Sequence, residues 1–140
     1  MIFKKLRDDA IIPPLPYYEY DAGRDLFLPE DVSVPAFSSI VVGFGIYMPA
    51  FPAPVGGLVP FVLLTPRSHF TVKHNILPVT GVIDCGYTGE IKVTLLNPTN
   101  EAIELNKVDS PCQAVLQYGE KSVSQTGEPR NENSFGSSSH

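Results

Sequence analysis

Proline constrains this chain more than any other feature, because 14 of its 140 residues are prolines, spread from Pro13 to Pro129. This share is about twice the average for globular proteins. Proline lacks a backbone N–H and its ring clashes with the preceding helical turn, so this density interrupts long helices. The sequence therefore excludes a helical bundle and favours short elements separated by turns.

A stretch without any charged residue runs from Val32 to Pro66. A membrane-spanning helix needs about 20 consecutive apolar residues. This stretch carries Pro49, Pro52, Pro54 and Pro60 and four glycines, which would break such a helix repeatedly. We interpret it as buried strands joined by a long Pro/Gly loop at Pro49–Pro60, and we expect no membrane role.

Short runs rich in β-branched and aromatic residues, or alternating apolar and polar residues, predict strands. The turn signal at 97–100 predicts that two of these runs, 91–95 and 102–105, pair as a hairpin. Residues 68–74 allow at most one short helical turn. The fold class expected is all-β, a distorted jelly roll or β-barrel. The predicted strands are 32–34, 40–47, 61–64, 91–95, 102–105 and 114–118.

Charge and cysteine content exclude several classes of function. The net charge of −5 argues against a non-specific nucleic-acid binder. Two cysteines, Cys85 and Cys112, form neither a disulfide framework nor a four-ligand zinc site, and we expect both to be buried on strands. The first residues show no secretory pattern, so an intracellular location, in cytoplasm or nucleus, is expected.

The composition changes after Glu120, where Ser, Asn, Gln, Gly and Glu replace the large apolar residues. Such a segment has little to bury in a core. The sequence therefore predicts a β-domain over 1–119 and a flexible tail over 120–140.

The densest candidate for chemistry is Gly81–Ile91, which has the pattern of a strand, a glycine-containing turn and a second strand. Asp84 stands where the first strand ends, and Tyr87 stands on the turn. An ordinary hairpin whose Asp caps its turn explains this segment by itself. The functional alternative is a carboxylate on a rigid element that takes a proton from water, with Tyr87 as a flat wall for a ligand ring.

Four further segments have both an ordinary and a functional interpretation. Asp25, in a charged loop before a strand, could lie near a divalent ion. Arg67 and Ser68 could hold phosphate oxygens. The segment 109–113 is a turn entering a strand, and 130–138 is a polar tail with one Arg and one Phe. Taken alone, each of these is explained better by an ordinary surface loop, turn or solvated tail.

The order and spacing of the five segments carry more information than any one of them. Gly-Val-Ile-Asp, the Tyr three residues later and Gly-Glu-Ile together resemble the third signature of the trimeric deoxyuridine triphosphatase (dUTPase) family. Residues 22–26, 66–68, 109–113 and 130–138 resemble the first, second, fourth and fifth signatures, and 73–76 resembles the stretch after the second signature. The resemblance runs from about residue 3 to residue 138.

The resemblance implies Mg²⁺-dependent hydrolysis of dUTP to dUMP and pyrophosphate by a jelly-roll homotrimer whose sites combine residues from three chains. Asp84 would be the general base, and Asp25 would hold Mg²⁺ through water. Tyr87 would pack under the deoxyribose and exclude a ribose 2′-OH, the backbone of 85–91 would read the uracil, and Phe135 would stack on it. The substrate-binding residues implied are Arg67, Ser68, His69, Gly81, Val82, Ile83, Tyr87, Glu90, Ile91, Lys92, Gln113, Arg130, Phe135, Gly136 and Ser137. No nucleic acid and no membrane is expected as a partner.

Some positions depart from the family pattern, namely Arg24, His69, Ser110, Asn131 and Ser134, and the Pro49–Pro60 loop is long. The pattern resembles a divergent, virus-encoded member, for which the location would be the host cell. Two alternatives stay open from the residues. One is a catalytically impaired dUTPase-fold protein that acts as a binding or regulatory module. The other is a dCTP deaminase of the same superfamily.

Overall fold

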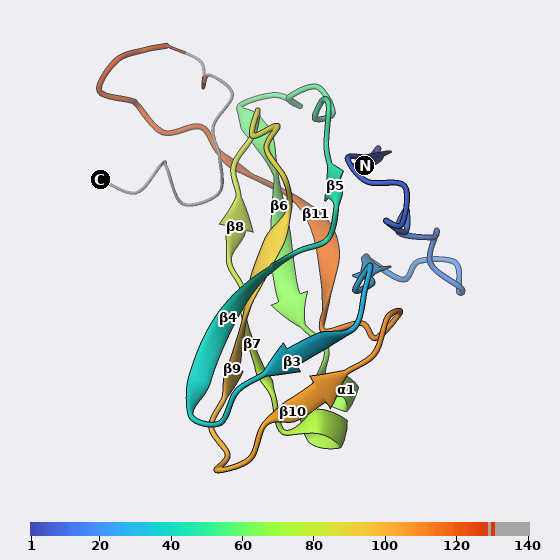
Figure 1. Ribbon diagram of the computed structural model, residues 1–140. Helices are drawn as coiled ribbons and strands as arrows, with labels where there is room; N and C mark the ends of the chain where they lie inside the picture. Colours follow the sequence, from blue (N-terminus) through green and yellow to red (C-terminus); the bar gives the residue numbers. More distant parts are fainter. Residues whose placement is uncertain (129, 131–140) are drawn as a thin grey trace.

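The computed structural model describes residues 1–128 and 130, and strands with one short helix make up the regular structure of this part (Figure 1). The elements are β1 (Lys4–Lys5), β2 (Gly23–Leu26), β3 (Val32–Val34), β4 (Ser38–Gly43), β5 (Ile46–Tyr47), β6 (Leu58–Pro66), α1 (Ser68–His74), β7 (Leu77–Val79), β8 (Val82–Ile83), β9 (Lys92–Asn97), β10 (Ile103–Leu105) and β11 (Cys112–Glu120).

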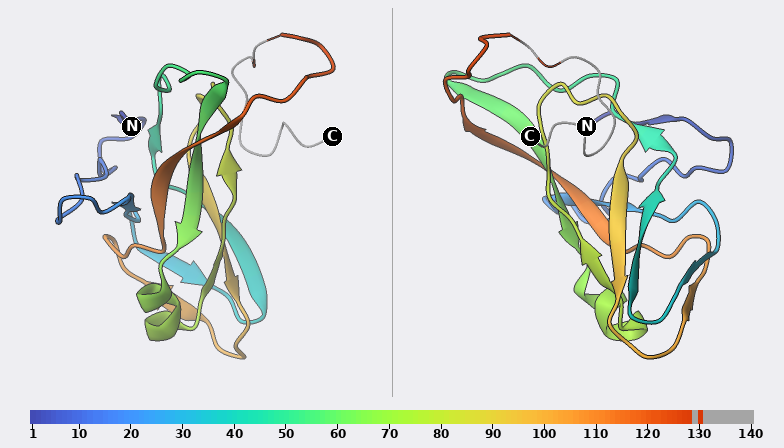
Figure 2. Two further views of the ribbon diagram at one scale, coloured as in Figure 1. Left: turned by 180° about the vertical axis from the view of Figure 1, so that it is seen from behind. Right: turned by 60° about the vertical axis from the view of Figure 1, so that its left-hand side comes forward.

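The largest sheet has the strand order β2-β11-β6-β8, and its pairs are antiparallel. A second sheet has the order β4-β9-β7, and two short ribbons, β1-β5 and β3-β10, complete the fold. The long strands β6 and β11 run side by side through the centre of the molecule, with α1 at one end (Figures 1 and 2). The jelly-roll expectation is confirmed.

The alternating burial of side chains along the strands explains which residues form the core. In β6 the side chains of Val62 and Leu64 are buried while their neighbours are partly exposed, and in β9 Val93 and Leu95 are buried in the same way. This is the period of two that a half-buried strand requires. The largest fully buried side chains are Phe44, Leu26, Leu28, Ile46, Met48, Leu64, Ile76, Ile91, Leu95 and Leu105.

The predicted hairpin between 91–95 and 102–105 is wrong. β9 pairs with β4 and β7, whereas β10 pairs with β3. The reason lies in Asn97, which is fully buried at the end of β9. Its amide donates to the carbonyls of Val34, Pro35 and Glu101 at 2.8–3.1 Å, so the chain turns toward β3 and does not fold back along β9.

The hairpin predicted over Gly81–Ile91 also differs from the structure. β8 pairs with β6, while β9 belongs to the other sheet, so in the described part of the chain the two arms diverge. What remains is a turn in which the Tyr87 N–H donates to the Asp84 carbonyl at 3.1 Å. Cys85 lies exposed on this turn, which corrects the expectation that both cysteines are buried; Cys112 is buried on β11.

The uncharged stretch forms β3 to β6, and a loop after β5 leads into β6 as expected. α1 has 7 residues, slightly more than the single turn predicted. In residues 1–128 and 130, no helix has the length and apolar character needed to cross a bilayer. β11 extends to Glu120, next to the predicted domain boundary, which stays a prediction.

Candidate functional site

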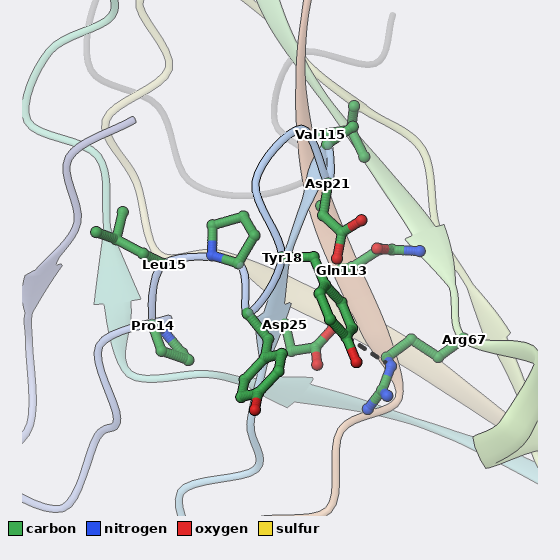
Figure 3. A pocket seen from close by; sticks show the side chains of 12 residues that line it. Pro14, Leu15, Tyr18, Asp21, Asp25, Arg67, Gln113 and Val115 are labelled. Atoms are coloured by element: carbon green, nitrogen blue, oxygen red, sulfur yellow. Dashed lines mark ion pairs between the residues drawn. The ribbon is translucent and has the colours of Figure 1, made fainter.

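A pocket of about 720 Å³ opens at the β2 edge of the large sheet (Figure 3). Asp25 on β2, Gln113 on β11 and Arg67 after β6 all line it. Their proximity follows from strand register, because Gln113 pairs with Asp25 on one side and with Thr65 on the other. Thus the first, second and fourth signatures meet at one place.

An ion pair joins two of these residues, since Arg67 Nε lies 3.3 Å from Asp25 Oδ1. About one third of each side chain is exposed, so both groups remain accessible to a ligand in the pocket. Gly23 leaves room for Gln113: a Cβ at this position would lie 1.9 Å from Gln113 Oε1. Gly23 therefore leaves the Gln113 side chain free to lie across β2 in its present position, and a larger residue there would make the end of Gln113 move.

The fourth signature holds the second in place. The Arg67 N–H donates to the Pro111 carbonyl at 3.0 Å, and His74 Nε2 at the end of α1 lies 3.8 Å from Asp109 Oδ2. Ser110 is buried and its hydroxyl donates to the Cys112 carbonyl, so this departure from the family pattern has a structural role. Ser68 and His69 lie exposed at the start of α1.

Asp84 lies at the opposite edge of the same sheet, directly after β8. Its side chain is 60% exposed, and its Oδ2 is 3.2 Å from Arg130 Nη2. Both residues line a second pocket of about 580 Å³, together with Cys85 and Val82. A base at this position has direct access to water.

Tyr87 is buried behind Asp84, and its hydroxyl donates to the Glu90 carbonyl at 3.1 Å. Burial raises the pKa of Tyr87, and the Glu90 charge raises it further, while Arg130 acts in the opposite direction. The hydroxyl is therefore neutral and a hydrogen-bond donor at neutral pH.

The structure thus divides the predicted residues between two edges of one sheet. Asp25, Arg67 and Gln113 meet at β2, whereas Asp84, Tyr87 and Arg130 lie around the turn after β8. The remaining predicted residues of this segment flank the same turn: Gly81 and Val82 are exposed, Ile83 and Ile91 are buried, and Glu90 and Lys92 are partly buried. Phe135, Gly136 and Ser137, with Asn131 and Ser134, lie outside the described residues.

Arg24 departs from the family pattern, and its guanidinium contacts Pro14, one of the residues that line the pocket. Its guanidinium donates to the carbonyls of Met1, Pro13 and Pro14 and lies 4.9 Å from the centre of the Phe3 ring. Desolvation by burial lowers its pKa. Because side chains alternate along β2, Arg24 faces away from Asp25 and fastens the N-terminal segment to the sheet.

Part of the pocket wall was not predicted from the sequence. Pro14, Tyr18 and Asp21 line the same pocket as Asp25 (Figure 3). The signal that could have indicated them is the dense run of prolines and tyrosines just before the first signature. The pocket wall is therefore more aromatic than the signatures alone suggest.

Known proteins resemble this chain over most of its length. The sequence model of the dUTPase family matches residues 9–139. The chain belongs to the dUTPase family. It is 40% identical to a deoxyuridine 5'-triphosphate nucleotidohydrolase of Nautilia profundicola, over 81% of this chain and 76% of that protein. It is 35% identical to the protein of the same name from Paramecium bursaria Chlorella virus 1, over 84% and 78%.

Solved structures of phage dUTPases share the fold. A mutant dUTPase from phage phi11 of S. aureus, described with a structural Mg(II) ion, superposes with a TM-score of 0.73 at 22% identity over 91% of this chain and 96% of that chain. The Staphylococcus bacteriophage 80alpha dUTPase with dUPNHPP superposes with a TM-score of 0.72 at 22% identity, over 99% and 98%. Viral members are thus among the relatives of this dUTPase.

Proposed function

We propose that this chain hydrolyses dUTP to dUMP and pyrophosphate, with Asp84 as the general base. The observation that carries the proposal is the turn after β8, which holds an exposed carboxylate, Asp84, three residues before a buried tyrosine, Tyr87. The order and spacing of these residues resemble the third dUTPase signature. The names of the relatives that match the chain support the same reaction.

In the proposed reaction, Asp84 takes a proton from the water that attacks the α-phosphorus, and the pyrophosphate leaves with the electrons of the broken P–O bond. A carboxylate that is 60% exposed can reach such a water. Tyr87 would pack against the deoxyribose, where a ribose 2′-OH would collide with the ring. The backbone between Cys85 and Ile91 would read the edge of the uracil.

The β2 pocket suits the triphosphate. Arg67, Ser68 and Gln113 would lie along the phosphates, and Arg130 would reach the terminal phosphate. The chain has a net charge of −5, so its overall field repels a polyphosphate. Binding therefore depends on these local cations, as phosphoryl transfer generally does.

The residues of this pocket fit a magnesium ion that arrives with the substrate. Mg²⁺ in nucleotide sites is usually held by one or two carboxylates, phosphate oxygens and waters. Asp25 is a partly exposed carboxylate beside the phosphate-binding Arg67, and among the described residues no cluster of three or more metal-binding side chains occurs. When bound, Mg²⁺ would neutralise charge on the phosphates; Asp25 would hold it through water.

Trimeric assembly would bring the two edges together. The dUTPase family is trimeric, and in the single chain Asp25 and Asp84 lie at opposite edges of one sheet. We propose that the β2 pocket of one subunit faces the β8 turn of a neighbour, so that each site uses residues of several chains.

A nucleotide panel tests the proposed function. Purified protein with Mg²⁺ should release pyrophosphate from dUTP and far less from UTP, dCTP or dTTP. Asp84→Asn should lower kcat by about 10²- to 10⁴-fold, the range of general-base catalysis, while leaving the assembly unchanged in size-exclusion chromatography. Asp31→Asn, a matched carboxylate outside both pockets, should keep full activity. No pyrophosphate release from dUTP would refute the proposal, and ammonia release from dCTP would establish the deaminase instead.

A further inference from the structure

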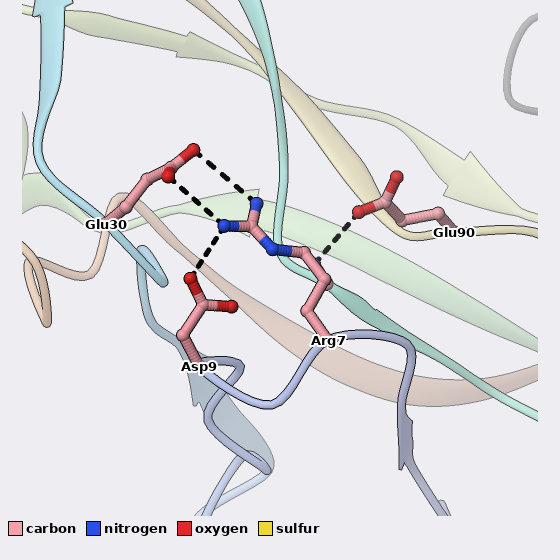
Figure 4. Close-up of polar contacts among 5 residues, drawn as sticks. Arg7, Asp9, Glu30 and Glu90 are labelled. Carbon is pink, nitrogen blue, oxygen red and sulfur yellow. Dashed lines mark hydrogen bonds and ion pairs between the residues drawn. The ribbon is translucent and has the colours of Figure 1, made fainter.

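The carboxylate of Glu90 lies at the turn between β4 and β5 (Figure 4). Its Oε2 accepts a hydrogen bond from the Gly45 N–H at 3.0 Å. The side chain is thereby engaged within the chain, at the far end of the segment that begins with Asp84.

Backbone hydrogen bonds surround this contact on both sides. The Phe44 N–H donates to the Ile91 carbonyl at 2.9 Å, and the Ile91 N–H donates to the Ile46 carbonyl at 3.0 Å. The Gly45 N–H lies between these two bonds, and Glu90 supplies its acceptor. A buried or half-buried N–H without an acceptor is costly, so the Glu90 side chain completes the junction of the two segments.

Glycines at two positions make room for the Glu90 carboxylate and for the turn at Gly45. A Cβ on Gly43 would lie 2.3 Å from Glu90 Oε2, so only glycine leaves room for the carboxylate. Gly45 has a φ of +70°, a conformation that other residues rarely adopt. On its other side, Arg7 lies against Gly45 and is held by ion pairs to Asp9 and Glu30 (Figure 4).

The same residue is connected to the turn that carries the base. The Tyr87 hydroxyl donates to the Glu90 carbonyl at 3.1 Å, and the Tyr87 N–H donates to the Asp84 carbonyl at 3.1 Å. A continuous set of contacts therefore runs from the β4–β5 turn through Glu90 and Tyr87 to Asp84.

We propose that the Glu90 side chain is a positioning residue, which fixes the Tyr87 ring and thereby sets discrimination between deoxyribose and ribose. The proposal rests on the proposed dUTP hydrolysis. The proposal refines the expectation that Glu90 is a substrate-binding residue. The Glu90 carboxylate binds the Gly45 N–H, so only the backbone of Glu90 would face the substrate.

The decisive comparison is between Glu90→Ala and Glu90→Gln. Gln keeps an oxygen that can accept from Gly45, whereas Ala does not. Ala should raise the KM for dUTP and lower the dUTP/UTP ratio of kcat/KM, each by about tenfold, because small misplacements near a reacting centre have large effects on rate. Gln should stay within about twofold of the unsubstituted protein. Glu104→Ala serves as the control, since this carboxylate bonds to Ser33 on the β3-β10 ribbon.

Gly43→Ala provides a second variant that leaves the chemistry of Glu90 intact. Its Cβ would displace the carboxylate, so this variant should reproduce the loss of dUTP/UTP discrimination. In a Glu90→Ala background, Gly43→Ala should have little further effect, because the carboxylate with which the new Cβ would collide is absent.

Hydrogen exchange separates this proposal from the proposed function. Without nucleotide, the amides of 84–91 should exchange faster in Glu90→Ala than in Glu90→Gln, whether or not dUTP is hydrolysed. Equal damage from Gln and Ala would show that the charge itself matters and would overturn the proposal. The proposal would also be overturned if Glu90→Ala lowered the Tm but left unchanged the KM for dUTP, the dUTP/UTP ratio of kcat/KM and the exchange of the amides of 84–91. Absence of dUTP hydrolysis in the unsubstituted protein would instead refute the function alone.

Discussion

Arg130 Nη2 donates to Asp84 Oδ2 at 3.2 Å, so the start of the C-terminal segment touches the proposed general base of its own chain. The pair is solvent-accessible, with 60% of the Asp84 side chain exposed, and contributes less than about 1 kcal/mol to folding. Arg130 is therefore available to exchange the carboxylate for a phosphate.

Replacing Arg130 by Ala should consequently affect catalysis far more than stability. We expect kcat/KM for dUTP to fall by about 10- to 100-fold, the range of a lost charge-assisted hydrogen bond, and Tm to change little. Arg130→Lys should recover only part of the loss because it cannot bind bidentately. Steady-state pyrophosphate release and thermal melts of the three proteins measure this. A large fall in Tm with normal kcat/KM would contradict it.

Arg24→Met tests the role of the Arg24 guanidinium in fastening the N-terminal segment. Three carbonyls lose a charged donor, and the Phe3 ring loses the guanidinium that lies over it. We expect the free energy of unfolding to fall by about 1–3 kcal/mol. Urea denaturation measures this, and the KM for dUTP should change less than about twofold. Loss of activity at unchanged stability would show that Arg24 belongs to the site after all.

Asn97→Ala tests the buried amide that directs the chain from β9 toward β3. The substitution leaves the carbonyls of Val34, Pro35 and Glu101 without this donor and also removes the acceptor of the Thr99 N–H. We expect a loss of about 2–4 kcal/mol in the free energy of unfolding. Chemical denaturation should show this loss with an unchanged dependence of the unfolding free energy on denaturant concentration. A loss of unfolding free energy below about 0.5 kcal/mol, typical of an ordinary surface substitution, would refute this account.

Tyr87 should make stability depend on pH in the alkaline range. Its folded pKa is raised above the ordinary value of about 10, chiefly by burial. The unfolded tyrosine therefore loses its proton first as the pH rises. The stability that this group contributes is fully present below pH of about 10 and is lost as the pH rises through the folded pKa. Urea unfolding at several alkaline pH values should show this decline in the unsubstituted protein and less of it in Tyr87→Phe.

Several strands were predictable because alternation and apolar runs are local properties of the sequence. Val62, Leu64, Val93 and Leu95 are buried as a period of two requires. Pairing was not predictable, since β10 pairs with the distant β3, and the Asn97 amide that directs the chain there donates to acceptors that lie partly in distant sequence. A turn signal indicates that the chain reverses but not which strand it meets.

The sequence singles out candidate residues for the site but does not predict how they are arranged. Short signatures identify Asp25, Arg67 and Asp84 because their chemistry is tied to fixed neighbours. Their separation on two edges depends on the strand order β2-β11-β6-β8, which no short motif encodes. The contact of Glu90 with Gly45 was missed for the same reason, since 45 residues separate the partners.

The placement of Asp25 and Asp84 at opposite edges of one sheet has a genetic consequence. In the proposed assembly, a subunit damaged at one edge would still offer an intact half-site at the other. Two inactive variants, Asp25→Asn and Asp84→Asn, would therefore complement each other when co-assembled in equal amounts. With random mixing in a closed ring of heterologous contacts, about one quarter of the half-site pairs would combine two intact edges. Conversely, a subunit with both substitutions would inactivate the sites that it shares with both of its neighbours. The allele that encodes it would therefore be dominant.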